Sequence, residues 1–381
     1  MIAVRILLTS GTVMPNNNLP ISEVWINKDD ISQTKVVECE FNTQSLGVDQ
    51  VLLKTDSFGF SANNITYALL GDKMGYWGFF PADEGWGKVP VWGFATVVAS
   101  IHPNVVIGEK VFGYLPMASH LVITAGKTSA SHFYDVDVKR KSISPVYDNY
   151  LRCAKDPGYQ LNREAWQLNY RPLFMTSFVL DDFVGEQLVP DVQNIIVTSA
   201  SSKTAYGTAF LLQQHKAERG QHYNVVGLTS KANKVFVDEL GCYDQVIEYG
   251  DIDQLSAQGN SWLLDFSGNK LFIVNLQKQL SSYLTRMLFI GATDVQSQEH
   301  KPEGHLPGEV FFAPAQVKKR THEWGAEGFS QKYTQAWQQF SRHIEGKVSV
   351  ANYRGVTAIE AVYQQGLVGT LDNRKINVLE F

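Results

Sequence analysis

The chain has 381 residues, enough for two domains or for one domain inserted into another. Hydrophobic residues make up 44% of the sequence and charged residues 19%, an ordinary balance for a globular protein. The net charge of −5, without any long basic run, argues against a protein that binds nucleic-acid backbones.

The cysteines and the hydrophobic segments indicate the compartment. Cys39, Cys153 and Cys242 are far apart and never form a C-x-x-C pair, which argues against a disulfide framework and against a sulfur-rich structural zinc site. The N-terminal apolar stretch is too short to span a membrane and lacks a signal-peptide cleavage region, and no later segment approaches a membrane span. We therefore expect a cytoplasmic protein without membrane attachment.

The first half of the chain has the pattern of a β-rich domain. Its extended, turn-rich segments predict mostly antiparallel or barrel-like β structure. The clearest of them are VLLKTDSFGFSANN at 51–64, VPVWGFATVVAS at 89–100 and GEKVFGYLPMASHLVI at 108–123.

From residue 194 to residue 293, short apolar runs alternate with segments whose apolar residues recur at helical spacing. This alternation predicts a parallel sheet that is covered by helices on both faces. Such sheets bind ligands at the carboxyl ends of their strands, where this chain places Ser, Thr and Gly. The expected strands are NIIVTSA, NVVGLTS, DQVIEYG, WLLDFSG and RMLFIGAT, and the expected helices are KTAYGTAFLLQQHK, KANKVFVDEL and NKLFIVNLQKQLSSYL.

The last segment, residues 355–381, predicts a helix, a glycine-containing turn and a closing strand. A single terminal strand needs a sheet to join, and the first domain can supply one. We therefore predict a β-rich domain formed by residues 1–171 and 311–381, with a parallel-sheet domain at 172–310 inserted between them.

Several of these segments occur in the order of the landmarks of medium-chain dehydrogenases/reductases. GEKVFG and LGCYDQVIEY are moderately specific by themselves, and the order and spacing of the whole set are stronger evidence. From about Val51 to the C-terminus the chain most resembles the zinc-independent quinone oxidoreductases, and its SASSKT and FFAPAQ segments are similar to those of an uncharacterised bacterial family of that superfamily. The resemblance implies a GroES-like β-rich domain and a Rossmann-type dinucleotide-binding domain, and it favours a homodimer.

The stretch VTSASSKTAYG stands where the resembled enzymes have a glycine-rich turn beside the cofactor pyrophosphate. Gly207 matches the last glycine of that turn, whereas Ser201 and Thr204 replace its alanine and its first glycine. Ser201, Ser202 and Thr204 can add hydroxyl donors and Lys203 a positive charge, so the turn can bind phosphate with a changed geometry. The alternative is an N-cap and a polar turn that bind no ligand.

A second interpretation of the same turn is a degraded P-loop, G-x-x-x-x-G-K-[ST]. Lys203 and Thr204 fit its last two positions, but its glycine positions fall on Val197 and Ser202. Loss of both glycines removes the backbone cradle for phosphate, so the sequence favours a dinucleotide enzyme over an NTPase.

The end of the second expected parallel strand indicates which dinucleotide is bound. An acidic residue there suits the ribose hydroxyls of NADH and repels the 2′-phosphate of NADPH. This strand end has hydroxyl and ammonium groups and no carboxylate, which predicts NADPH. The resemblance adds Tyr249 near the adenosine and Thr176, in MTSF, as a further cofactor contact. The residues at the strand end are Thr229, Ser230, Lys231 and Lys234, and the alternative is that both lysines are ordinary solvated residues.

The segment NNITYALLGDKMGYWGFFP corresponds to the part of the resembled enzymes that lines the substrate side of the nicotinamide. Tyr67 and Tyr76 approximate the tyrosines of those enzymes, and a tyrosine there can deliver a proton after the hydride arrives. Asn64 can orient the acceptor through its amide. The alternative is that the aromatic residues of this segment only pack a core.

No zinc site is expected. Zinc-dependent relatives begin theirs with a cysteine-containing turn, where this chain has FGFSANN with Phe58 and Ser61. The nine histidines are scattered, and none belongs to an H-E-x-x-H motif or has a nearby cysteine ligand. His120 is the histidine most expected near the substrate, although a lone histidine beside apolar residues is more often structural.

These features predict an NADPH-dependent, metal-independent oxidoreductase that passes hydride to a quinone or a conjugated carbonyl. We expect a small, planar, apolar substrate, because an aromatic-rich pocket accepts such molecules. Two alternatives stay open. One is an enoyl-thioester reductase, which needs a specific proton donor, and the other is a non-catalytic NADPH-binding sensor, which the altered glycine turn allows.

Overall fold

The computed structural model describes residues 5–6, 17–140, 145–255, 259–290 and 308–381. Contacts group the chain into two compact units, Met1–Asn169 with Val350–Phe381, and Tyr170–Ser349. The sequence analysis assigned residues 311–349 to the β-rich domain. In the structure they group with the inserted unit, because the helix that they form packs on other helices of that unit. No helix in the described ranges is long and apolar enough to cross a membrane.

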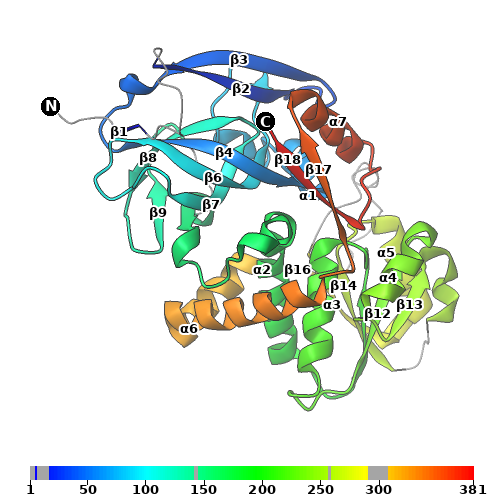
Figure 1. The fold of residues 1–381 in the computed structure, drawn as a ribbon. Helices are drawn as coiled ribbons and strands as arrows, with labels where there is room; N and C mark the ends of the chain where they lie inside the picture. The colour runs from blue at the N-terminus through cyan, green and yellow to red at the C-terminus, as the bar shows by residue number, and fades with distance from the viewer. Residues whose placement is uncertain (1–4, 7–16, 141–144, 256–258, 291–307) are drawn as a thin grey trace. The chain divides into compact units, whose positions relative to one another are not determined.

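Six antiparallel strands of the first unit close into a barrel (Figure 1, blue and cyan), which confirms the β structure predicted for the first half of the chain. Each strand pairs with the next, and the last pairs again with the first. The strands in this order are β4 (Gln50–Phe60), β6 (Pro90–Ser100), β7 (Lys110–Pro116), β10 (Asn149–Arg152), β9 (His132–Asp135) and β8 (His120–Gly126).

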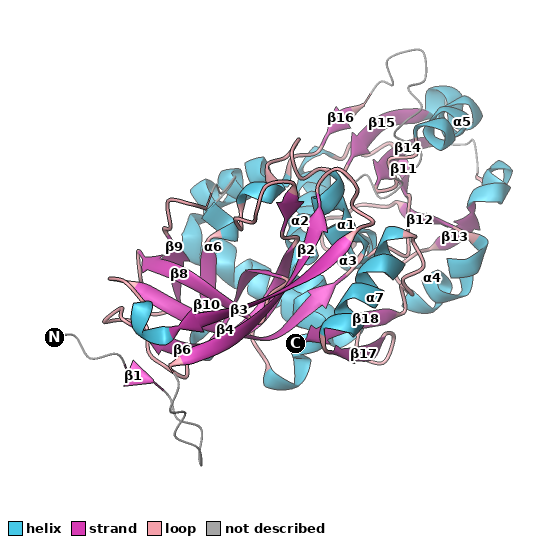
Figure 2. Ribbon diagram, turned by 90° about the horizontal axis from the view of Figure 1, so that it is seen from above, coloured by secondary structure: helices cyan, strands magenta, loops and turns pink. Residues whose placement is uncertain are grey.

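The C-terminal strand joins this barrel as predicted. β18 (Lys375–Glu380) pairs antiparallel with β4, and α7 (Val356–Leu367) lies beside β18 in Figure 2. Gly369, with φ of 71°, makes the left-handed turn that ends the helix. The other elements of this unit are β1 (Arg5–Ile6) on β6, β17 (Ser349–Arg354) on β18, β3 (Thr34–Asn42) and β5 (Trp86–Gly87) on β2 (Asn18–Asn27), and α1 (Ala62–Leu69), which contacts α7.

The barrel and α7 share one hydrophobic core. Alternate residues of β4 and β6 point inward, because successive side chains of a strand point to opposite faces of a sheet. The apolar face of α7 packs into the same core, so the C-terminal segment is an integral part of the unit. The fully buried core residues of β4, β6 and α7 are Val51, Leu53, Phe58, Phe60, Val91, Ala95, Val97, Ile359, Val362 and Tyr363.

The second unit contains a six-stranded parallel sheet in the order β13-β12-β11-β14-β15-β16. This is the 3-2-1-4-5-6 order of a Rossmann fold, which confirms the predicted α/β class. The strand order reverses at β11, where sheets of this kind bind ligands. The strands are β11 (Val192–Val197), β12 (Asn224–Thr229), β13 (Gln245–Glu248), β14 (Asn260–Asp265), β15 (Leu284–Phe289) and β16 (Glu309–Val310).

Helices surround this sheet, and aromatic side chains hold three of them together. Phe174 of α2 (Glu164–Gln187) stacks on Phe340 of α6 (Ala313–His343) with ring centres 4.7 Å apart. Tyr206 of α3 (Lys203–His215) packs edge-on against the same Phe340 ring at 5.1 Å. α3, α4 (Lys234–Leu240) and α5 (Lys270–Leu280) are the three helices predicted from the apolar spacing.

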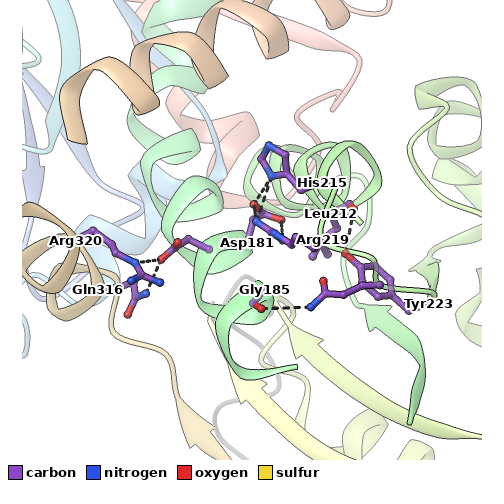
Figure 3. A network of polar contacts seen from close by, with 10 residues as sticks. Asp181, Gly185, Leu212, His215, Arg219, Tyr223, Gln316 and Arg320 are labelled. Atoms are coloured by element: carbon purple, nitrogen blue, oxygen red, sulfur yellow. Dashed lines mark hydrogen bonds and ion pairs between the residues drawn. The ribbon is translucent and has the colours of Figure 1, made fainter. Parts of the chain in front are cut away.

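A buried ion pair also fixes the turn that follows α3 to α2 (Figure 3). Asp181 of α2 is 1% exposed and accepts hydrogen bonds from Arg219 Nη1 at 2.9 Å and from Arg219 Nη2 at 2.7 Å. The His215 ring nitrogen Nδ1 lies 2.7 Å from Asp181 Oδ2, the oxygen that also accepts from Arg219 Nη2. A Cβ at Gly185 would lie 2.6 Å from the Arg219 guanidinium carbon, so this glycine makes room for the arginine on the surface of α2.

Candidate functional site

The turn after β11 departs from β geometry at Ser199, whose φ of 48° lies in the left-handed region. Glycine usually occupies such a position, because a Cβ makes the conformation costly. Hydrogen bonds hold the turn: Ser199 N donates to Tyr249 Oη at 2.7 Å, and Ala200 N donates to Leu228 O at 3.0 Å. Ser202 N donates back to Ser199 O at 2.7 Å. The chain therefore makes the strand-to-helix turn without a glycine.

Four of the predicted phosphate-binding residues lie together where α3 begins. Ser202 is the N-cap of α3, and its hydroxyl accepts a hydrogen bond from the backbone of the first turn at 3.4 Å. Ser201 is buried, whereas Lys203 and Thr204 are half-buried. Lys203 Nζ lies 5.6 Å from the centre of the Tyr170 ring, a cation–π contact. The N–H groups and the dipole of a helix N-terminus favour an anion at this end of α3.

Gly207 permits close packing between α3 and α2. A Cβ at this position would lie 2.7 Å from Ser177 Oγ and 3.0 Å from the Phe174 ring. Ser177, the third residue of MTSF, also bonds to α3, because its Oγ donates to Thr204 O at 2.8 Å. Its neighbour Thr176 is half-buried on α2. Helix packing is the role of the last glycine in dinucleotide-binding turns.

A buried carboxylate lies next to the turn, at the end of β14. Thr198 Oγ1 donates to Asp265 Oδ1 at 2.6 Å, and both residues are fully buried. Asp265 also accepts hydrogen bonds from Ser267 Oγ at 2.7 Å and from Gly268 N at 3.0 Å. These donors compensate the buried charge and fix the segment that follows β14 beside the segment that follows β11. No spacing in the sequence distinguishes Asp265 from an ordinary residue at a strand end, so the sequence did not predict it.

The four predicted residues at the end of β12 have different environments. Thr229 is 1% exposed, whereas Ser230 and Lys231 are exposed. The Lys231 ammonium makes no ion pair with any residue in the described part of the chain. Lys234 Nζ, in contrast, donates to Asp238 Oδ2 at 3.0 Å and to a backbone carbonyl of β13 at 3.3 Å. Lys231 is therefore better suited than Lys234 to contact an added phosphate.

Tyr249 follows β13 and reaches the turn after β11. Its hydroxyl accepts the Ser199 N–H, and its ring packs edge-on against Phe272 of α5 at 4.7 Å. The sequence predicted a place for this tyrosine beside the adenosine, and its hydroxyl lies on the backbone of the turn. A half-buried ring in this position can still present one face to a ligand.

Tyr67 and Tyr76, in the first unit, belong to one aromatic cluster. Their ring centres are 4.6 Å apart. Tyr114 of β7 lies 5.9 Å from Tyr67, and Tyr147 lies 4.8 Å from Tyr114. We call these four residues the tyrosine cluster. Its last two members come from segments 38 and more positions away along the chain, and no local pattern pointed to them. The aromatic packing considered as the alternative for this segment is therefore present in the structure.

Burial keeps the phenols of the tyrosine cluster neutral. It raises the pKa of Tyr67 to about 12. It also raises the pKa of Tyr76, Tyr114 and Tyr147 above the ordinary tyrosine value. At neutral pH each of these hydroxyls therefore carries its proton and can donate it or share it in a hydrogen bond.

Asn64 is buried and caps α1. Its Oδ1 accepts a hydrogen bond from Ser61 N at 2.9 Å, and its Nδ2 donates to Pro90 O at 3.1 Å. These bonds attach the start of α1 to β6. The predicted role in orienting an acceptor would have to use the remaining donor and lone pair of this amide.

The described residues contain no group of three or more His, Cys, Asp and Glu side chains that could hold a metal ion. His120 is 9% exposed, and its Nδ1 lies 2.9 Å from Ser119 Oγ. Burial and, to a smaller extent, the positive charge of Lys54 together lower the pKa of His120 to about 4. This histidine is therefore a neutral residue of the barrel at neutral pH.

The sequence matches, over residues 58–372, the model of a family described as "Protein of unknown function (DUF2855)". A comparison with curated proteins gives no match. Solved structures similar to this chain include CurA from Vibrio vulnificus in complex with NADPH, with 12% identity, 94% of this chain and 98% of that chain covered, and a TM-score of 0.62.

Two further similar structures cover nearly whole chains. The mitochondrial 2-enoyl thioester reductase Etr1p/Etr2p heterodimer from Candida tropicalis has 13% identity, a TM-score of 0.56 and coverage of 95% of this chain and 100% of that chain. The yhdH oxidoreductase from Salmonella enterica in complex with NADP has 11% identity, a TM-score of 0.53 and coverage of 95% and 99%. At such identities the likeness establishes only the fold, which is the predicted combination of a Rossmann-type parallel-sheet unit and a β-rich unit.

Proposed function

The chain belongs to the DUF2855 family, and we propose that it is an NADPH-dependent oxidoreductase that transfers hydride to a conjugated carbonyl or a quinone without a metal. The observation that carries this proposal is the turn between β11 and α3. It lies at the reversal point of a 3-2-1-4-5-6 sheet, and it presents Ser201, Ser202, Lys203 and Thr204 at a helix N-terminus.

The residues of the second unit fit a dinucleotide. Hydroxyls and the Lys203 ammonium would hold the pyrophosphate where α3 begins, and the exposed Lys231 would hold the 2′-phosphate of the adenosine ribose. CurA and the yhdH oxidoreductase, which share the fold, were crystallised with NADPH and with NADP. NADPH supplies a hydride from its nicotinamide ring when it is bound.

The tyrosine cluster of the first unit suits the acceptor side of the reaction. The rings of Tyr76, Tyr147 and Trp92 are only partly buried and would offer an apolar, aromatic surface that suits a planar molecule. Tyr67 would give its proton to the acceptor as negative charge develops there, because burial keeps this phenol protonated. We expect the other tyrosines of the cluster to exclude water from this proton.

An enoyl-thioester reductase is the second candidate for the reaction. The likeness to the 2-enoyl thioester reductase heterodimer favours it, as does a further structure of Etr1p in complex with NADP and crotonyl-CoA. Assays of the purified protein with quinones, enones and enoyl thioesters would separate the two candidates. Tight NADPH binding without turnover of any of these compounds would favour the third possibility, a cofactor-binding sensor.

The protein is expected to bind NADPH more tightly than NADH. Replacement of Lys231 by alanine should weaken NADPH binding by about 1 kcal/mol, roughly fivefold, because an exposed lysine contributes modestly to a phosphate contact. The affinity for NADH should not change, since NADH has no 2′-phosphate. Fluorescence titration of both cofactors measures the effect, and equal affinities of the wild type for NADPH and NADH would refute the assignment.

Replacement of Lys203 by alanine is expected to weaken the binding of both dinucleotides. Loss of a charge-assisted contact to the pyrophosphate costs roughly 1.5–3 kcal/mol, or about ten- to a hundredfold in affinity. Lys216→Ala is the matched control, because Lys216 follows the opposite end of α3 from Lys203 and also lies near an aromatic ring. Its Nζ pairs with Asp244 at 3.0 Å and lies 5.9 Å from the centre of the Tyr223 ring. Similar affinities of the Lys203 and Lys216 variants would show that Lys203 does not contact the cofactor.

A further inference from the structure

We propose that Tyr243 is a positioning residue for the cofactor, because its hydroxyl and that of Tyr249 hold the backbone of the glycine-free turn in the geometry that the dinucleotide requires. This inference rests on the proposed function of the same turn. It assigns a role to a tyrosine that is absent from the predicted site, and it explains how a serine can hold the left-handed conformation at position 199.

The two hydroxyls bind the turn on either side of the Ser199–Ala200 peptide bond. Tyr249 Oη accepts the Ser199 N–H at 2.7 Å, and Tyr243 Oη donates to Ala200 O at 2.9 Å. A third bond, from Ala200 N to Leu228 O at 3.0 Å, attaches the same residue to β12. The left-handed turn is thus fixed by bonds from outside the turn, whereas a glycine would relax into it without such support.

Gly227 leaves space for the Tyr243 side chain to reach the turn. A Cβ on Gly227, in the middle of β12, would lie 2.8 Å from the Tyr243 ring and 3.1 Å from the Cβ of Ala200. The tyrosine ring therefore crosses β12 where the strand has no side chain. A glycine inside a strand weakens it, so close approach of a ring to the backbone accounts for this glycine.

These bonds determine which groups can face the pyrophosphate. The Ser199 N–H is turned to Tyr249, so the groups left for the anion are those that follow, at the start of α3. A shift of the Ser199–Ala200 peptide bond would move the N-cap Ser202, which is bonded to Ser199 O at 2.7 Å. The tyrosine hydroxyls therefore affect cofactor binding indirectly, because they fix the position of the first residues of α3.

The test is the NADPH affinity of Tyr243→Phe, which removes the hydroxyl and keeps the ring. We expect the dissociation constant to rise about fivefold, the effect of one lost hydrogen bond, and KM for NADPH to rise with it while kcat changes little. Tyr223→Phe is the matched control, because Tyr223 Oη also donates to a backbone carbonyl of the same unit, Leu212 O, at 3.0 Å (Figure 3). Both variants should lose similar stability in urea, and only Tyr243→Phe should lose affinity.

A second variant tests the same geometry from the strand. Gly227→Ala must displace the Tyr243 ring, so we expect it to weaken NADPH binding by a similar factor and to add little to Tyr243→Phe in the double variant. If the wild type binds NADPH and the Tyr243→Phe and Tyr223→Phe variants bind it with equal affinity, this inference alone is overturned. A wild type that binds neither NADPH nor NADH would overturn the proposed function, and this inference with it.

Discussion

Replacement of Asp181 by alanine is expected to lower the free energy of unfolding by about 2–4 kcal/mol. Removal of one partner of a buried ion pair typically costs about 3–5 kcal/mol, because the other charge remains without compensation. The Asp181 carboxylate is 1% exposed, but the Arg219 side chain is 24% exposed and can partly recover water, so we expect a somewhat smaller loss. Urea unfolding of the two proteins at pH 7 measures the difference.

The control for this prediction is Asp238→Ala, which breaks a solvent-exposed pair. Lys234 and Asp238 are one helical turn apart on α4, with Nζ and Oδ2 3.0 Å apart, and both side chains are at least 36% exposed. Loss of such a pair costs about 0.5 kcal/mol. Losses of equal size in the two variants would show that Asp181 and Arg219 do not act as a buried pair in solution.

The parallel sheet could be predicted from the sequence because each of its main strands is an apolar run between helical repeats. β11, β12 and β14 are buried over most of their length, and each contains a short apolar run: IIV in β11, VV in β12 and WLL in β14. The C-terminal strand could be predicted for a different reason, since a lone strand must find a partner. The position of α6 could not be predicted, because its packing on Phe174 depends on aromatic contacts between residues that are far apart in the sequence.

The candidate site was predicted only in part for a similar reason. A hydroxyl-rich turn after an apolar strand is a local pattern, so Ser201, Ser202 and Lys203 could be selected from it. The left-handed φ of Ser199 and the tyrosine hydroxyls that bind this turn are not local, because the two tyrosines lie 43 and 50 positions further along the chain than the residues they bind. The partner of Lys234 lies one turn along its own helix, and a solvated lysine and a paired one have the same sequence signature there.

Replacement of Tyr67 by phenylalanine should have the largest effect on catalysis. If Tyr67 gives its proton to carbon, as reduction of an enoyl thioester requires, its loss should lower kcat by about 10²–10⁴. With a quinone as acceptor the effect should be much smaller, because the oxygen atoms of the product exchange protons with water without help. NADPH affinity should be unchanged in both cases, since the substitution keeps the ring that packs 4.6 Å from Tyr76.

The pH profile and a second variant complete this test. Because burial raises the pKa of Tyr67 to about 12, the phenol should stay protonated from pH 6 to 10, and its ionisation should cause no loss of rate in that range. Tyr76→Phe is the control, because Tyr76 is a partly exposed member of the same cluster and should cost much less if Tyr67 is the donor. Full activity of Tyr67→Phe with enoyl thioesters, or a larger loss in Tyr76→Phe, would show that Tyr67 does not deliver the proton.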